Sequence, residues 1–246
     1  MTTPVDQPEE PKEESSGMPF LDHLEELRRR LIWAFLAVVI MSAVAFYFSD
    51  YLLEFIQMPL KGVPLHNMQV TGAFYAYLKI SLFVGVVAAL PVVFYHMWRF
   101  IAPGLYERER MMVIPLVLIS TILFLIGASF CFVIVLPLAL QFLIGFAEGL
   151  ITNYITIDSY LSFAGLLMLA FGFGFQMPIV AYFLGRAGII SAGFLAKGRR
   201  YAVVLILVAA AIITPPDVFT QVLLGIPLYV LYEVSIIVVR VVQRQK

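Results

Sequence analysis

The run MMVIPLVLISTILFLIGASFCFVIVLPLALQFLIGFA, residues 111–147, holds 37 residues without one charged side chain. A membrane-spanning helix needs about 20 mainly apolar residues, so this run alone predicts a membrane protein. It is too long for one crossing, and Pro137 divides it because proline removes a helix hydrogen bond. We therefore predict a span over 111–136 followed by an interfacial segment. A two-span hairpin is the alternative, but no polar turn separates the halves.

The composition of the whole chain agrees with this class. Hydrophobic residues make up 62% of the 246 residues and charged residues only 13%, whereas soluble domains are about 45–50% apolar. Cys131 is the single cysteine, so a disulfide within the chain is impossible, and the three histidines are scattered. We predict no metal site and no cofactor. The net charge is zero, so the overall charge does not indicate any kind of partner. We predict no binding to nucleic acid.

Five further apolar segments complete an all-α membrane protein with six predicted spans. The spans are about 31–48, 74–98, 111–136, 159–184, 201–213 and 219–239. They form one membrane domain over 19–240, between a polar, proline-containing tail (1–18) that we expect to be disordered and a short tail at 241–246. Apolar residues recur at helical spacing over 19–30, which predicts a helix lying at the membrane surface. Residues 43–45 resemble a signal-peptidase site, so a cleaved signal peptide is the alternative for the first span.

The distribution of basic residues predicts the orientation. All Lys and Arg residues except Lys61 and Lys79 fall in the N-terminal segment, the 2–3 and 4–5 loops, and the C-terminus. Basic residues flanking spans are retained on the cytosolic side, so both termini are predicted to be cytosolic. A hairpin in the third run would break this pattern, and six spans preserve it.

The last two spans are unusual. The fifth has only 13 apolar residues, and the sixth contains Pro227 and Glu233. Either the bilayer thins locally around this pair, or the fifth span begins inside the loop assigned to the cytosol. Prolines in or beside most spans predict bent helices that enclose a concave surface.

No residue set in the sequence is spaced for catalysis. Residues 172–174, Gly-Phe-Gly, lack the third glycine and the preceding strand of a nucleotide site. Their glycines predict close helix packing. We therefore predict that the protein is not an enzyme.

Acidic residues among arginines are the first candidates for a binding site. Glu25 and Glu26 lie in HLEELRRRL (23–31), and Glu107 and Glu109 lie in LYERER (105–110). One interpretation is solvated charge on interfacial segments. The other is a site for a basic peptide, since carboxylates bind the planar fork of arginine in a bidentate manner that lysine cannot reproduce.

Two polar residues of the membrane region need an explanation. Gln176 lies in the middle of the fourth span, where its amide could bond a partner helix, worth about 1 kcal/mol, or be satisfied internally. Asp217 follows a Thr-Pro-Pro turn, and its simplest role is to cap the N-terminus of the sixth span.

Together these motifs resemble the TatC family, the multi-spanning subunit of the twin-arginine protein translocase. The resemblance covers nearly the whole chain after residue 18 and rests on six segments in order: HLEELRRRL (23–31), MPL (58–60), WRFIAPGLYERER (98–110), SYLSF (159–163), FGFGFQMPIV (171–180) and TPPDVFTQVLLGIPLYVLYE (214–233).

The resemblance implies a function. TatC-like proteins recognise signal peptides with two adjacent arginines on folded cargo. They act in the cytoplasmic (inner) membrane, in a multimeric complex with single-span TatA-like and TatB-like partners. Transport depends on the protonmotive force.

The resemblance also implies residue roles. Glu26 and Glu109 would contact the signal arginines, with Phe100 completing the site and Arg28 supporting it. Further sites are a partner-helix contact at Gln176 and two structural positions on the outer face, Pro59 and Asp217. Many family members carry glutamate in place of Gln176, and glutamine cannot titrate, so a role here would be a polar contact.

The competing hypothesis is a small-solute secondary transporter, although spans 1–3 and 4–6 show no convincing repeat.

Overall fold

A computed structural model describes residues 18–60, 62–101, 113–145, 154–214 and 217–244. The predicted tail at 1–18, apart from Met18, lies outside these residues, as do Glu107 and Glu109.

The described chain is helical, and the all-α prediction is confirmed. Its α-helices are α1 (Met18–Tyr47), α2 (Ser49–Ile56), α3 (Gly72–Ile101), α4 (Val113–Phe130), α5 (Leu136–Gly145), α6 (Ile157–Gly174), α7 (Met177–Arg186), α8 (Ala192–Lys197), α9 (Arg199–Ile213) and α10 (Val218–Arg244). A 3₁₀ turn, η1 (Met58–Leu60), follows α2, and a π-helical segment, η4 (Cys131–Val135), joins α4 to α5. In the part of the chain described, the only β-type pairing is an isolated bridge between His66 and Thr156.

Within the described residues, five helices are long and apolar enough to cross a membrane. They are His23–Tyr47, Gly72–Ile101, Val113–Gly145, Ile157–Arg186 and Val218–Arg244. The predicted fifth span corresponds to α9, whose 15 residues extend about 22 Å against a hydrocarbon core of about 30 Å. Six spans therefore stay a prediction that depends on α9. Gly198 alone separates α9 from α8, so a start of this span inside the preceding loop stays open.

Two helices continue where the sequence predicted a boundary. The predicted surface helix and the first span form one helix, α1, because residues 20–40 contain neither glycine nor proline. The third of the five long helices, Val113–Gly145, runs past Pro137, so the break predicted there is absent. The π-helical η4 directly precedes Pro137. It changes the hydrogen-bond register where the proline ring would meet the preceding turn, and the helix continues.

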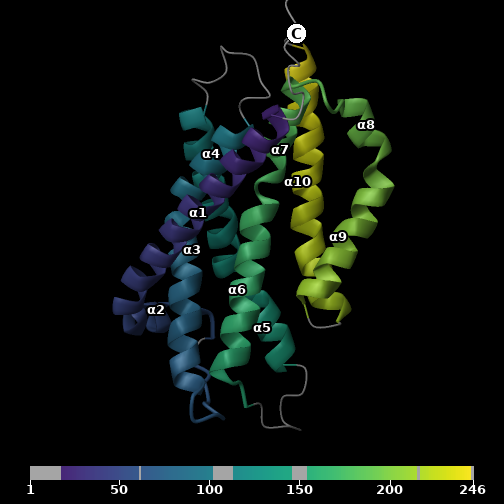
Figure 1. The fold of residues 1–246 in the computed structure, drawn as a ribbon. Coiled ribbons are helices and arrows are strands. Elements are labelled where there is room, and N and C mark those ends of the chain that lie inside the picture. The colour runs from purple at the N-terminus through teal and green to yellow at the C-terminus, as the bar shows by residue number, and fades with distance from the viewer. Residues whose placement is uncertain (1–17, 61, 102–112, 146–153, 215–216, 245–246) are drawn as a thin grey trace, which may run out of the picture.

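The helix ends sort into two groups along the bundle (Figure 1). The start of α1 and the ends of α3, α7 and α10 lie at the same end, together with α8. We call this the basic end, because the last turns there carry Arg99, Arg186, Lys197 and Arg244. At the opposite end, the cap end, lie α2, the end of α5, the end of α9 and the start of α10. The two ends of the described chain therefore lie on one side, as the charge distribution requires.

Close helix approach holds the bundle together. A Cβ at Gly172 in α6 would lie 2.5 Å from Phe124 Cζ in α4, and one at Gly85 in α3 would lie 2.5 Å from the Ser42 Cα in α1. The packing role predicted for the glycine at 172 is confirmed. Lipid gives no hydrophobic driving force between helices, so van der Waals contact of this kind is what stabilises the association.

Candidate functional site

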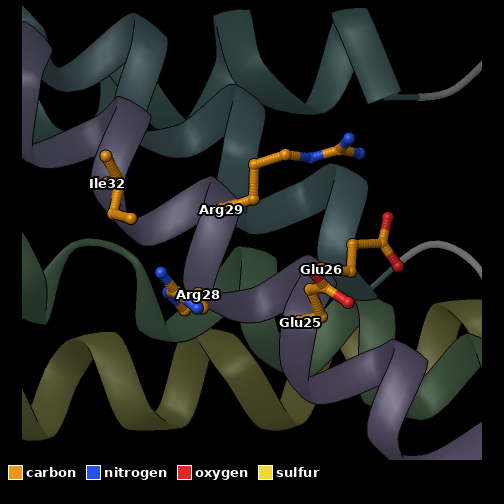
Figure 2. Close-up of a pocket in the computed structure, with 5 residues that line it drawn as sticks. All are labelled: Glu25, Glu26, Arg28, Arg29 and Ile32. Atoms are coloured by element: carbon orange, nitrogen blue, oxygen red, sulfur yellow. The ribbon is translucent and has the colours of Figure 1, made fainter.

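A groove at the basic end carries both signs of charge. It has a volume of about 440 Å³ and is lined by Glu25, Glu26, Arg28, Arg29 and Ile32. All five residues come from α1, within about two turns (Figure 2). Glu25 and Glu26 of the predicted acidic motif therefore line this groove together with arginines of the same helix.

Glu26 is held in place by Arg30, one helical turn further along α1. The Arg30 Nε donates to Glu26 Oε1 at 3.1 Å, Nη2 donates to the same oxygen, and Nη1 donates to the His96 carbonyl of α3 at 3.4 Å. The Arg30 side chain is only 12% exposed, against 30% for Glu26. Arg30 thus belongs to the α1–α3 interface and fixes one carboxylate oxygen, while the other, Oε2, accepts no hydrogen bond from the residues described.

The other charged residues of the groove are held less firmly. Glu25, Arg28 and Arg29 are exposed, and no ion pair joins any of them to another described residue. In Figure 2, Arg28 and Arg29 point in different directions from the helix. The interpretation as solvated charge fits these three side chains better than it fits Glu26.

Phe100 reaches the same region from the end of α3. Its ring stacks on His23 of α1, with centroids 4.4 Å apart and planes at 16°. The His23 Nδ1 in turn lies 4.0 Å from Glu26 Oε2. The fold therefore brings Glu26 and Phe100 together through His23, and their role in peptide binding stays a prediction. Glu109 lies outside the described residues.

Gln176 lies in the interior, at the junction of α6 and α7. Its side chain is 8% exposed, and Nε2 donates to the Ser120 carbonyl of α4 at 2.9 Å. The Ser120 hydroxyl accepts from Trp98 Nε1 at 2.9 Å. An internal hydrogen bond thus satisfies the amide donor, which is one of the two interpretations of this residue. Contact with a partner helix stays a prediction.

Asp217 and Pro59 lie at the cap end, where the first caps a helix and the second is buried in a turn. Asp217 Oδ1 accepts from the Thr220 backbone N–H at 2.7 Å, so the helix-capping role predicted for it is confirmed. Pro59 is buried in η1. Beside η1, the Tyr160 hydroxyl donates to the Ile56 carbonyl, which ties the end of α2 to α6.

Sequence reasoning missed a second carboxylate–arginine pair. Arg199 of α9 donates to both Glu233 oxygens of α10, at 2.7 and 2.9 Å, and Tyr229 donates to Glu233 at 2.9 Å. The charge inside the sixth predicted span is thereby paired. The Arg30–Glu26 pair could have been found from its i,i+4 spacing. No sequence signal relates Arg199 to Glu233, which lie 34 positions apart. The same is true of His23 and Phe100.

No cluster of three or more metal-ligating side chains exists among the residues that the structure describes. Fold and site together define the class: a multi-spanning α-helical membrane protein with an anchored carboxylate in a charged groove at one end of its bundle.

Comparisons with known proteins place the chain within this class. Residues 22–227 match the family model of Sec-independent protein translocase protein (TatC). The chain is 47% identical over 235 residues to the Sec-independent protein translocase protein TatC of Aquifex aeolicus, which covers 93% of this chain and 98% of that protein. It is 42% identical over 238 residues to that of Desulforapulum autotrophicum, covering 95% and 88%. A crystal structure of a twin-arginine translocase receptor, TatC, superposes with a TM-score of 0.82 at 46% identity and covers 90% of this chain and 99% of that one.

The chain belongs to the TatC family, and the resemblance seen in its motifs is confirmed. Family membership makes it a component of a protein translocase. It does not favour the alternative of a small-solute transporter.

Proposed function

We propose that this protein is the twin-arginine signal-peptide receptor of its translocase. The single observation that carries the proposal is the state of Glu26, a carboxylate held by Arg30 with one oxygen accepting no hydrogen bond from the described residues. A guanidinium donates well to such an oxygen, because charge-assisted hydrogen bonds are shorter and stronger than neutral ones. Glu109, from the segment that follows α3, supplies the second carboxylate.

The surroundings of Glu26 support this role. Arg30 contacts α3 as well as Glu26, so the carboxylate is oriented before a guest arrives. Preorganisation of this kind lowers the cost of binding, since less side-chain freedom is lost on association. Phe100 lies nearby, and Arg28 lines the same groove.

The remainder of the molecule acts as a scaffold without chemistry of its own. It sits in the cytoplasmic (inner) membrane with both termini in the cytosol, which agrees with the start of α1 and the end of α10 lying at the basic end. TatA-like and TatB-like single-span proteins assemble around it into a multimeric complex. Contact of a partner helix with Gln176 requires that the residue exchange its internal bond to the Ser120 carbonyl, because it is buried. Transport of folded cargo is driven by the protonmotive force.

Peptide binding to the purified protein in lipid nanodiscs tests the proposal. A labelled signal peptide with the Arg-Arg pair should bind, and a peptide with Lys-Lys should bind far more weakly. Glu109→Ala should abolish binding, whereas Glu107→Ala, its matched control two residues away, should have a milder effect. Equal, unimpaired binding by both variants would refute the assignment of Glu109.

A cellular assay provides an independent check. Reversing the charge of both Glu26 and Glu109 should stop the export of folded proteins that carry twin-arginine signals. Normal export by that double variant would remove the basis of the proposed receptor site.

A further inference from the structure

His23 has a position that the proposed receptor site does not explain. One face of its imidazole ring is covered by the Phe100 ring, at 4.4 Å between centroids and nearly parallel. The side chain is nevertheless 48% exposed. A half-exposed aromatic ring, supported from behind by a second ring, presents a flat and accessible surface.

This flat surface lies beside Glu26 Oε2, the carboxylate oxygen that accepts no hydrogen bond from any described residue. The His23 Nδ1 lies 4.0 Å from Glu26 Oε2, too far for a hydrogen bond but close enough for one guest group to contact both. His23 and Glu26 are three residues apart on α1 and therefore lie on the same side of the helix. The ring is set at this angle by Phe100, which comes from a different helix.

We propose that His23 is a specificity-determining residue that selects arginine over lysine in the guest peptide. The guanidinium of one guest arginine lies flat on the exposed face of the imidazole and donates to Glu26 Oε2. Behind the imidazole, Phe100 acts as the support that keeps the ring in place. The inference rests on the proposed receptor function, and it adds the reason why a lysine is a poor substitute.

The chemistry of the two cations explains the selection. A guanidinium is planar, weakly hydrated and able to stack on aromatic faces while it donates hydrogen bonds from its edge. An ammonium group is a compact, strongly hydrated charge, so it can pair with Glu26 but gains little from the ring. Glu26 alone therefore supplies affinity for either cation, and the stacked rings supply the discrimination.

The inference is tested by measuring the affinities of three peptides for the wild-type protein and its variants in nanodiscs. The peptides differ only in the basic pair, which is Arg-Arg, Arg-Lys or Lys-Arg. Stacking of a cation on an aromatic ring contributes about 0.5–1 kcal/mol at exposed sites and more when desolvated. His23→Ala should therefore weaken Arg-Arg binding roughly fivefold. It should weaken binding of one of the two lysine peptides much less. The ratio of affinities between the Arg-Arg peptide and that lysine peptide should therefore become smaller. His23→Phe, which keeps a flat ring, should retain most of the discrimination.

Two further variants control for folding and for the loss of any histidine. His23→Leu keeps an apolar contact with Phe100 but offers no flat face, and it should behave like His23→Ala. His66 at the cap end also contacts an aromatic ring, that of Tyr154 at 5.2 Å, and His66→Ala should leave all three affinities unchanged.

The outcomes separate the two proposals. A wild-type protein that fails to bind the Arg-Arg peptide refutes the proposed function itself. A wild-type protein that prefers arginine, with the same preference kept in His23→Ala and His23→Leu, overturns the role of His23 and leaves the receptor function intact. An equal loss for all three peptides also overturns it, because that pattern indicates a structural role.

Discussion

The charged groove on α1 and the cap end of the bundle treat their charged residues in opposite ways. In the groove, Glu25, Arg28 and Arg29 are exposed without an ion pair to any described residue, and Glu26 accepts hydrogen bonds from the described residues through Oε1 only. At the cap end, polar side chains bond one another across helices. Lys79 of α3 contacts both Asp158 and Ser162 of α6, and the Tyr77 hydroxyl donates to Asp50 of α2 at 2.8 Å.

Backbone groups at the cap end are satisfied in the same manner. The His66 N–H donates to the Ile155 carbonyl at 2.8 Å, and the Ile157 N–H donates to the His66 carbonyl at 3.1 Å. These bonds tie the loop before α3 to the start of α6. Because its polar groups are used to hold helix ends together, the cap end has a structural role. In the groove on α1, by contrast, no described residue forms an ion pair with Glu25, Arg28 or Arg29.

Removing the anchored carboxylate should give the largest effect and is the strongest test of this contrast. Glu26→Gln should weaken Arg-Arg peptide binding by about 30-fold or more, since losing one partner of a charge pair costs about 2–5 kcal/mol. Glu25→Gln is the matched control in the same groove, and we expect a change of at most about threefold, the scale of an exposed pair. Fluorescence anisotropy with a labelled peptide measures both. Equal losses from the two variants would mean that total negative charge matters and anchoring by Arg30 does not.

At the cap end the corresponding change should affect stability and leave binding intact. Asp217→Ala removes the acceptor for the Thr220 N–H and should lower the free energy of unfolding by about 1 kcal/mol. Asp217→Asn can still accept this bond and should lose much less. Thermal unfolding in detergent gives the stability, and the anisotropy assay gives the binding. A drop in peptide affinity for Asp217→Ala would contradict the division of roles between the ends.

The smallest effect is expected for the Lys79–Asp158 pair. Both side chains are well exposed, at 43% and 55%, and exposed ion pairs contribute about 0–1 kcal/mol. Lys79→Met should therefore change the melting temperature only slightly and should not change peptide affinity. Its effect should shrink further when the salt concentration is raised, because salt screens exposed charges. A large loss of stability that is independent of salt would show that this pair is more deeply involved in packing than its exposure indicates.

Interruptions within helices illustrate how far local sequence signals reach. Pro137 predicted a break, yet the helix continues through a π-helical segment. Between Gly174 and Met177, where Pro178 follows, the chain does leave the α-helix. Proline marks the place where a helix bond is lost, but the neighbouring helices determine whether the chain bends, changes register or stops.

The amino-acid sequence by itself determined the helical membrane class, the approximate positions of the apolar helices and the grouping of basic residues. These properties follow from composition and from runs of apolar residues, which are local and need no partner. It also identified Glu26, Phe100 and Asp217 as residues of interest, through motif resemblance and capping chemistry.

Only the tertiary structure decided which polar groups form hydrogen bonds or ion pairs between helices and which do not. Three contacts depend on how helices cross: the bond from Arg30 to the α3 backbone, the stacking of His23 on Phe100 and the bidentate Arg199–Glu233 pair. Contacts between residues far apart in the chain arise from helix packing, and periodicity within one helix carries no information about them.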